Sequence, residues 1–592
     1  MLTLSKPLSA GQVRTYHERE FASEQQNYWS RDQQGYSEWQ GALAQQWGLQ
    51  GEVGSEHFAR LTEGQHPITE TQLVRHQVSR TYEGKNGKEV TSFEHRAGWD
   101  ATFSAPKSVS LTALVGGDDR VREAHRESVR VALGELERYT QARIGNVHAP
   151  ETTGKFIAAT FEHDTARPVE GYAAPQLHTH AVIFNITERD NGQTRSVQSH
   201  ELYGSQRYAT SIYRAELASR LQGLGYEIES GKHGQPEIKG YTKEYLEASS
   251  PRREQIKDHL RAQGLDGAGA AQLAAHITRD AKELLSPEQV LQQHRELAAR
   301  YGHQADHVVA QAKEHGLHLN HEPDKAAQRA VTYARDHLFE RSAVEDRRSI
   351  FESALNRGMG ETTYIQVRLE FDRRLQAGEF RLAQASVRGP QITTAAMLRM
   401  ERETIQLMQE GNKRGFADPI LVSPSIRIAT EDRHPELNAA QREAVSQVFI
   451  AREKIVGLDG IAGGGKTTTL AVVREGAEAA GYTVEGFAPT SRAAQKLGEA
   501  GIETSTLQMH LAQRQKPVTG ERRLYVVDES SLASTKQMHD FLTRLHPNDR
   551  VLLVGDTRQH ESIEAGRIFA QLQDAGMKTF KLDEMCVRKI QS

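Results

Sequence analysis

The sequence predicts a multidomain chain in which an α+β domain with an antiparallel sheet precedes a helical region and an α/β domain. Its 592 residues are several times the length of a typical domain. β-rich runs separated by turn residues fill much of 98–185. Strand-like and helix-like segments alternate after residue 435, as in parallel α/β sheets. We therefore expect domains at 1–300, 301–425 and 426–592, the middle one mostly helical.

The composition excludes several classes of protein. The 74 Lys and Arg residues face 78 Asp and Glu residues, so no chain-wide positive field exists and any grip on nucleic acid must be local. The single cysteine, Cys586, excludes an intrachain disulfide and a thiolate-clustered metal site within one chain. No stretch has the roughly 18 apolar residues of a membrane span, and no signal peptide opens the chain. We expect a soluble, cytoplasmic protein.

Local patterns place the elements of the first domain. Ser9 and Gln12 have the spacing of a capping box, which predicts a helix to about Phe21. A second helix is expected near 119–143, and residues 231–236 look like a hairpin break. Strands are expected at 101–104, 108–115, 155–163 and 177–186.

Three histidines form the most informative pattern of the first half. His178 and His180 are two positions apart in a strand-like run, so both imidazoles face one side. His163 ends the preceding run, and an antiparallel hairpin would return its imidazole beside the other two. Three neutral imidazoles bind a divalent cation and leave coordination positions open for a substrate oxygen. The alternative is unrelated surface histidines in a chain that has 26 of them.

One carboxylate and two tyrosines complete the candidate site. Asp100, at the entrance to a strand, can orient a metal-binding imidazole or accept a proton from a hydroxyl nucleophile. Taken alone, it would be a turn or cap residue. Tyr16 lies on the first predicted helix and Tyr28 follows it. By position alone, these tyrosines would be half-buried packing residues.

These residues together resemble the N-terminal domain of MobF-type conjugative relaxases. The resemblance spans about 1–300 and includes SEWQG at 37–41, FSAPKSVS at 103–110 and PQLHTH at 175–180. It implies an HUH-type nuclease, with a five-stranded antiparallel sheet, that nicks one strand at a plasmid transfer origin. It further implies the following roles: Tyr16 as principal nucleophile, Tyr28 as second tyrosine, Asp100 as acidic partner, and His163, His178 and His180 as ligands of Mg, Mn or Zn.

The tyrosine chemistry has a clear physical requirement. A phenol with a pKa near 10 is about one part in a thousand ionised at pH 7, a deficit of roughly 4 kcal/mol. The cation and Asp100 would offset this deficit and align the scissile phosphate. Attack by Tyr16 would leave a 5′-phosphotyrosyl link and a free 3′-hydroxyl without consuming ATP.

A phosphate-binding loop opens the last domain. Residues 460–467 fit the pattern G-x-x-x-x-G-K-[ST] between an apolar run and a helical pattern. The glycines let backbone N–H groups approach phosphates, the lysine reaches the outer phosphates and the threonine can ligate magnesium. The predicted nucleotide-binding residues are Gly460, Gly463, Gly464, Gly465, Lys466 and Thr467.

Further polar residues follow the strands of this domain. Asp528 would hold magnesium, Glu529 would activate water and Gln559 would sense the γ-phosphate. With Gln441 as the adenine-contacting glutamine, these residues resemble the early motifs of a RecD-like superfamily 1 helicase, which MobF relaxases carry in the same chain. The resemblance implies one RecA-like domain without its second partner. We expect a C-terminally truncated module that binds ATP and Mg, has weak ATPase activity and does not unwind DNA processively.

The resemblance also implies partners. These are single-stranded DNA at a transfer origin, relaxosome accessory proteins and a type IV secretion coupling protein, in a bacterial cytoplasm from which the protein is translocated to a recipient cell. Two alternatives stay open. One is a rolling-circle replication initiator that shares the chemistry. The other is a catalytically silent protein that binds single-stranded DNA and acts as a motor, with histidines kept only for structure.

Overall fold

The computed structural model of the chain divides into two compact units. One comprises Met1–Ala334 and Arg348–Phe371, the other Arg335–Arg347 and Asp372–Ser592. The structure describes residues 1–16, 36–75, 80–83, 89–92, 95–145, 148–166, 168–265, 267, 270, 274, 285–316, 322–383, 390–413, 419–461, 465–515, 520–556 and 567–582.

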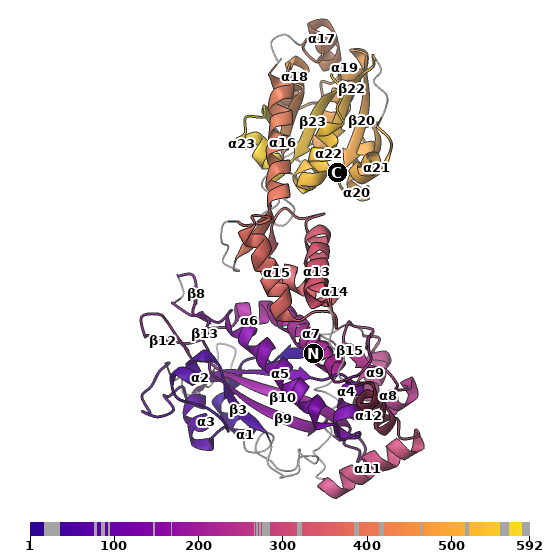
Figure 1. Cartoon of the computed structure of the whole chain (residues 1–592). Coiled ribbons are helices and arrows are strands. Elements are labelled where there is room, and N and C mark those ends of the chain that lie inside the picture. Colours follow the sequence, from indigo (N-terminus) through magenta and orange to yellow (C-terminus); the bar gives the residue numbers. More distant parts are fainter. Residues whose placement is uncertain are drawn as a thin grey trace. The chain divides into compact units, whose positions relative to one another are not determined.

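An antiparallel sheet forms the centre of the first unit (Figure 1). Its strand order is β1-β6-β10-β9-β3, and the short strand β2 also pairs with β6. The predicted antiparallel sheet is therefore confirmed, with β2 as a sixth strand beyond the five that the resemblance implied. The strands are β1 (Leu2–Leu4), β2 (Leu8–Ser9), β3 (Ser37–Gln40), β6 (Arg96–Ser104), β9 (Ala158–Thr165) and β10 (Pro175–Phe184).

The two long strands β9 and β10 pair as the antiparallel hairpin that the sequence predicts. His178 lies opposite His163, and His180 lies opposite Phe161 on β9 and Thr102 on β6. Directly paired residues of antiparallel strands share a face of the sheet. All three imidazoles therefore lie on one face.

Helices cover both faces of this sheet. α1 (Ala10–Tyr16), α2 (Ala42–Gln46) and α3 (Ser55–Thr62) pack on the histidine face, where their apolar side chains share a core with Phe161 and Phe184. α5 (Asp119–Glu137) and α7 (Gln206–Gly223) contact the opposite face, where Tyr213 meets Phe103. The capping box of α1 is present, with Ser9 and Gln12 exchanging backbone-to-side-chain bonds of 2.9 and 3.3 Å.

One predicted strand is wrong. The run at 108–115 forms helix α4 (Lys107–Leu114), which follows Pro106. From Ser108 to Ala113 polar and apolar residues alternate as in a strand, yet every residue from 108 to 114 is buried in the helix. A short, wholly buried run cannot be assigned to helix or strand by periodicity alone, and here tertiary packing decides for the helix.

The rest of the first half combines helices with short strands, and the middle of the chain is mostly helical. Further short strands of the first half are β4 (Arg80–Glu83), β5 (Glu89–Ser92), β7 (Gln141–Ala142), β8 (Glu151–Thr152), β11 (Thr187–Glu188), β12 (Thr194–Arg195) and β13 (Val197–Gln198). The predicted break at 231–236 is a hairpin of β14 (Ile228–Ser230) and β15 (Pro236–Ile238). A small sheet has the strand order β16-β18-β17. The bounds are α6 (His200–Gly204), α8 (Lys243–Ala248), α9 (Pro251–Gln263), α11 (Pro287–Arg300), α12 (Gln304–His315), α13 (Pro323–Leu338), α14 (Arg347–Arg357), α15 (Tyr364–Gln376), β16 (Glu345–Asp346), β17 (Phe380–Leu382) and β18 (Gln391–Thr394).

The second unit contains a parallel sheet with the strand order β21-β20-β22-β23-β19-β24. The predicted α/β class of this domain is confirmed. The strands are β19 (Ile455–Gly460), β20 (Tyr482–Ala488), β21 (Glu503–Thr506), β22 (Arg522–Val527), β23 (Arg550–Gly555) and β24 (Thr579–Leu582).

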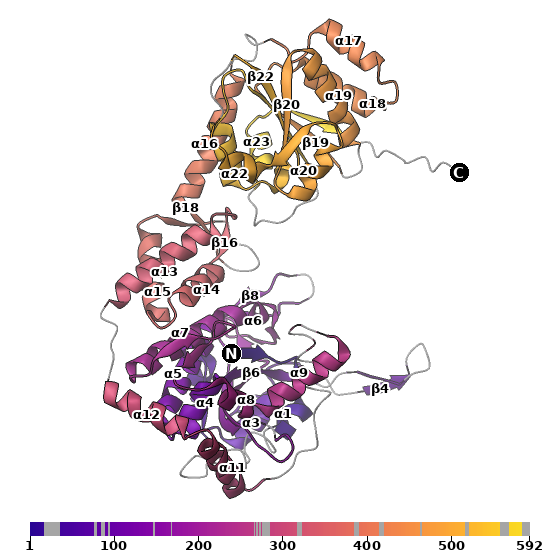
Figure 2. The ribbon, with the colours of Figure 1, turned by 90° about the vertical axis from the view of Figure 1, so that its right-hand side faces the viewer.

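Helices cover both faces of the parallel sheet (Figure 2). One core joins the sheet to α18 (Ala439–Ile450), α19 (Lys466–Ala479) and α20 (Ser491–Gly498). Another joins the opposite face to α16 (Ala395–Asn412), α22 (Thr535–Thr543) and α23 (Ile568–Asp574). In the described part of the chain, no helix combines the length and apolarity needed to span a bilayer.

Candidate metal centre and phosphate loop

The three histidines lie together at one end of the β9–β10 pair. Their ring centroids are 5.2 Å apart for His163 and His178, 5.2 Å for His163 and His180, and 5.1 Å for His178 and His180. One possible ligand atom from each residue lies within 4.8 Å of the other two. The spacing suits three ligands around one ion.

Hydrogen bonds orient two of the rings. His180 Nδ1 lies 2.7 Å from Asp100 Oδ2, and His178 Nδ1 lies 2.8 Å from the carbonyl oxygen of Gln176. An imidazole that donates through Nδ1 carries its lone pair on Nε2, the arrangement usual for metal-binding histidines. Burial lowers the pKa of His178 to about 4, so this ring is neutral at pH 7. The residues present therefore fit a divalent cation.

Asp100 reaches the cluster from the neighbouring strand β6. Its side chain is 12% exposed. The Thr102 hydroxyl donates to Asp100 Oδ2 at 3.1 Å and lies 3.2 Å from His180 Nδ1. The carboxylate is thus held beside His180 Nδ1.

The structure places only one of the two candidate tyrosines. Tyr16 is the last residue of α1, the helix that packs on the histidine face through buried Val13. Tyr28 lies outside the described residues. The backbone of Tyr16 is therefore on the same side of the sheet as the cluster.

Hydrogen bonds between residues 105–110 and residues 175–177 were not predicted from the sequence. Lys107 Nζ donates to the Pro175 carbonyl oxygen at 2.7 Å, and the Gln176 amide donates to the Ala105 carbonyl oxygen at 2.8 Å. The Ser110 hydroxyl accepts the backbone N–H of Leu177 at 3.1 Å. The segment that starts α4 therefore holds the start of β10, just before the paired histidines. Both segments stand out in the sequence, but nothing local shows that they touch.

The phosphate loop has the predicted order of strand, loop and helix. β19 ends at Gly460 and α19 begins at Lys466, whose Nζ donates to the Gly460 carbonyl oxygen at 3.1 Å. Gly465, before the helix, has a φ of 77°, which favours glycine. Thr467 lies in the first turn of α19, and Gly463 and Gly464 lie outside the described residues.

The other predicted nucleotide residues lie at the ends of neighbouring elements. Asp528 directly follows β22, accepts the backbone N–H of Glu529 at 2.8 Å, and has its pKa raised by burial. Gln441, on α18, donates to the Gly465 carbonyl oxygen at 3.4 Å and completes a capping box with Asn438. Gln559 lies outside the described residues.

The chain therefore joins a domain with a three-histidine cluster to a domain with a phosphate loop. Residues 10–301 match the TrwC relaxase family and residues 436–591 match an AAA domain. The chain thus carries a TrwC relaxase domain followed by an AAA domain, and it is homologous to TraI and TraA conjugation proteins and to RecD helicases.

Three curated relatives illustrate the similarity to conjugation proteins and helicases. The multifunctional conjugation protein TraI of Escherichia coli K12 is 35% identical over 301 residues, which are 49% of this chain and 15% of that protein. The conjugal transfer protein TraA of Rhizobium radiobacter is 34% identical over 187 residues, 31% of this chain and 16% of that protein. The ATP-dependent RecD2 DNA helicase of Deinococcus radiodurans is 35% identical over 145 residues, 23% of this chain and 20% of that protein.

Among solved structures, the metal-bound conjugative relaxase TrwC in complex with oriT DNA is 34% identical, with a TM-score of 0.42. The match covers 51% of this chain and 99% of that one. The chain spans about 15% of the length of the TraI relatives that it matches.

Proposed function

We propose that the chain is a conjugative relaxase that nicks one strand of plasmid DNA at a transfer origin by tyrosine transesterification, joined to an ATP-binding helicase module. The observation that carries this proposal is the cluster of His163, His178 and His180 with Asp100, on the sheet face where the helix ending at Tyr16 packs. The match to the TrwC relaxase family and the conjugation proteins among the relatives support the DNA substrate.

The chain's own residues account for the nicking step. His163, His178 and His180 would hold Mg, Mn or Zn, and the bound cation would supply positive charge against the scissile phosphate. Asp100 orients His180. The phenol oxygen of Tyr16 loses its proton and attacks phosphorus, and a 5′-phosphotyrosyl ester forms. The bond to the 3′ oxygen breaks and that oxygen takes up a proton, so one phosphodiester is exchanged for another. Tyr28 would serve a second strand transfer.

The second module would bind ATP and Mg. Its phosphate loop would use Lys466 and Thr467 together with Gly460, Gly463, Gly464 and Gly465. Asp528 would hold magnesium, Glu529 would activate water, Gln559 would sense the γ-phosphate, and Gln441 would contact adenine. The position of Lys466 and Gln441 beside the loop supports this assignment.

The proposal extends to partners and place of action. The substrate would be single-stranded DNA at the origin, presented by relaxosome accessory proteins. A type IV secretion coupling protein would receive the complex in a bacterial cytoplasm and pass it to a recipient cell. The similarity to conjugation proteins supports this setting.

The test is a covalent adduct on DNA. The protein and a Tyr16→Phe variant are mixed with Mg²⁺ or Mn²⁺ and supercoiled DNA that carries the chain's own gene and flanking sequence. We expect a metal-dependent protein–DNA link on the 5′ side of a nick, lost in the variant. Tyr203→Phe is the matched control, because Tyr203 is exposed on α6 and its hydroxyl binds the Ser5 carbonyl oxygen. An adduct that persists in Tyr16→Phe would refute the choice of nucleophile.

A second result would refute the catalytic proposal itself. If the wild-type chain forms no adduct on this DNA, while it binds single-stranded oligonucleotides tightly, then a silent DNA-binding protein explains the fold better. A Tyr28→Phe variant run alongside assigns the second tyrosine. It should still nick the supercoiled DNA but should lose the second strand transfer.

A further inference from the structure

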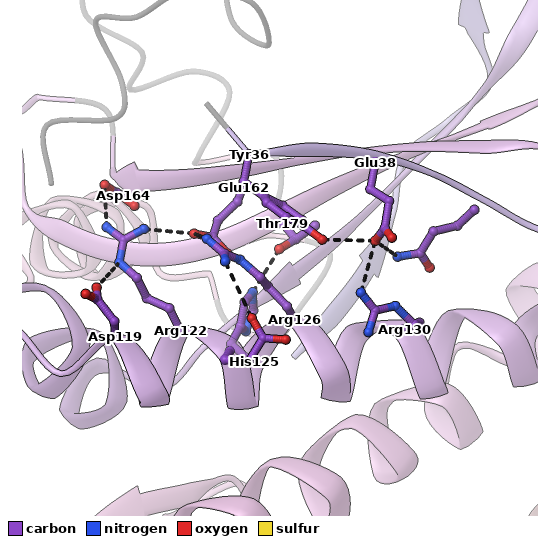
Figure 3. Close-up of polar contacts among 12 residues, drawn as sticks. Tyr36, Glu38, Asp119, Arg122, His125, Arg126, Arg130, Glu162, Asp164 and Thr179 are labelled. Carbon is purple, nitrogen blue, oxygen red and sulfur yellow. Dashed lines mark hydrogen bonds and ion pairs between the residues drawn. The ribbon is translucent and has the colours of Figure 1, made fainter. Parts of the chain in front are cut away.

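A polar network lies on the face of the sheet opposite the three histidines. Figure 3 shows this network between α5 and the strands. Arg122, His125 and Arg126 project from one side of α5 toward the strands. Their partners are Glu162 and Asp164 on β9 and Thr179 on β10.

The ion pairs in this network are close, and their carboxylates are buried. Arg122 donates to Glu162 Oε1 at 2.8 Å and to Asp164 Oδ2 at 2.7 Å, and Arg126 donates to both oxygens of Glu162 at 2.7 and 2.9 Å. The side chains of Glu162, Asp164 and Arg122 are 2%, 1% and 8% exposed. Arg126 is 23% exposed, so the two carboxylates and Arg122 are buried while Arg126 reaches the edge of the network.

His125 adds a neutral contact to the second strand. Its Nε2 lies 2.9 Å from Thr179 Oγ1 and its Nδ1 lies 2.8 Å from the Tyr213 hydroxyl of α7. The ring of His125 is fully buried. One helix therefore holds β9 through charges and β10 through a hydrogen bond.

The partners of α5 are the sequence neighbours of the candidate metal ligands. Glu162 and Asp164 flank His163, and Thr179 stands between His178 and His180. Side chains alternate along a strand, so a residue held from behind fixes the direction of the imidazole beside it. Each of the three histidines therefore has at least one sequence neighbour whose side chain contacts α5 on the opposite face of the sheet.

The strand pairing alone leaves this end of the sheet weakly defined. The β9–β10 register shifts between Pro175 and His178: Pro175 lies opposite Thr165, whereas His178 lies opposite His163. An irregular ladder interrupts the hydrogen bonds that would otherwise set the pairing. The contact of Arg122 with Asp164 lies at this irregularity, where an additional constraint has most effect.

A gain in stability is a weak explanation for the network. Buried ion pairs lose much of their attraction to desolvation, and apolar replacements of similar volume are often neutral or stabilising. A set of buried charges beside a ligand strand is better explained by the geometry that it imposes.

We propose that Arg122, His125 and Arg126 are positioning residues that hold β9 and β10 so that the three imidazoles are preorganised for a divalent cation. This inference rests on the proposed function, in which His163, His178 and His180 bind that cation. Removal of the network would leave the ligands present but less well aligned, and cation affinity would fall.

Paired apolar substitutions test the proposal while the charge balance is kept. The variants are Arg122→Met with Asp164→Leu, and His125→Phe with Thr179→Val. The matched control is Arg130→Met with Glu38→Leu, since Arg130 lies one turn further along α5 and its partner on β3 is not next to a histidine of the cluster. Mn²⁺ binding to the full chain without nucleotide is measured by calorimetry, and His163→Ala identifies the heat of the cluster.

We expect each network variant to bind Mn²⁺ about 10–100-fold more weakly than wild type, the effect usual for residues that orient metal ligands. Its melting temperature should stay near that of the control variant, and its Co²⁺ absorption spectrum should change. Wild-type affinity and an unchanged spectrum in both network variants would overturn the inference. If wild type itself shows no binding that His163→Ala removes, the proposed cation site fails, and the inference with it.

Discussion

Replacement of Asp100 by asparagine should weaken cation binding without removing any histidine. Asp100 Oδ2 lies 2.7 Å from His180 Nδ1, and the side chain is 12% exposed, so this contact is charge-assisted and mostly shielded from water. In Asp100→Asn the amide keeps nearly the same shape but carries no charge. The substitution therefore isolates the contribution of the Asp100 charge to the hydrogen bond with His180.

The expected size of the effect follows from the contact. Hydrogen bonds to charged groups contribute about 1.5–3 kcal/mol, and about 1.4 kcal/mol corresponds to a tenfold change in affinity. The asparagine oxygen can still accept from His180, so we expect the lower part of this range. The dissociation constant for Mn²⁺ should rise at least about tenfold.

Calorimetric titration with Mn²⁺ measures the effect, and Asp549→Asn provides the control. Asp549 is also buried and accepts the backbone N–H of His546 at 2.8 Å, but it belongs to the second unit and not to the histidine domain. It should lower the melting temperature but leave the Mn²⁺ affinity unchanged. Equal affinities of wild type and Asp100→Asn, within twofold, would refute the reasoning.

Three other predictions follow from the contacts. Lys466→Ala should weaken binding of a fluorescent ATP analogue at least tenfold, because the phosphate loop loses the positive charge of its lysine. Nicking of DNA should persist in this variant, because transesterification uses no ATP. Equal loss of ATP binding and nicking would contradict the assignment of the two activities to separate sites. Burial lowers the pKa of Lys107 to about 7, so between pH 7 and about 10.5 the unfolded chain binds more protons at this position. The stability of wild type relative to Lys107→Met should thus rise with pH in this window, by at most about 1.4 kcal/mol per pH unit, and urea denaturation at pH 7 and 9 that gives a constant difference would argue against it. A Cβ at Gly476 would lie 2.3 Å from the buried Phe449 ring, so Gly476→Ala should destabilise the protein by about 1–3 kcal/mol. A Cβ at Gly134 would have nothing within 4 Å, so Gly134→Ala should stabilise the protein by up to about 1 kcal/mol. Thermal unfolding that ranks the two variants the other way would show the packing argument to be wrong.

Patterns of short range determined much of this protein from the sequence alone. Alternation along a strand places His178 and His180 on one face whatever surrounds them. The capping box at Ser9 and the glycine-rich loop before Lys466 are equally local, because each needs only neighbours within a few positions. For this reason the antiparallel hairpin and the strand, loop and helix of the phosphate site agree with the structure.

Contacts between distant segments were decided only by the tertiary structure. Asp100 meets His180 across 80 positions, and Lys107 meets Pro175 across 68, so no local period encodes either pair. The run at 108–115 alternates polar and apolar residues as far as Ala113, as a strand does, yet it became a helix, with every residue from 108 to 114 buried by tertiary packing. The contacts of α5 with the residues beside the histidines could likewise not be predicted from the sequence. They depend on which helix packs behind the sheet, and the packing of the whole first unit sets that choice.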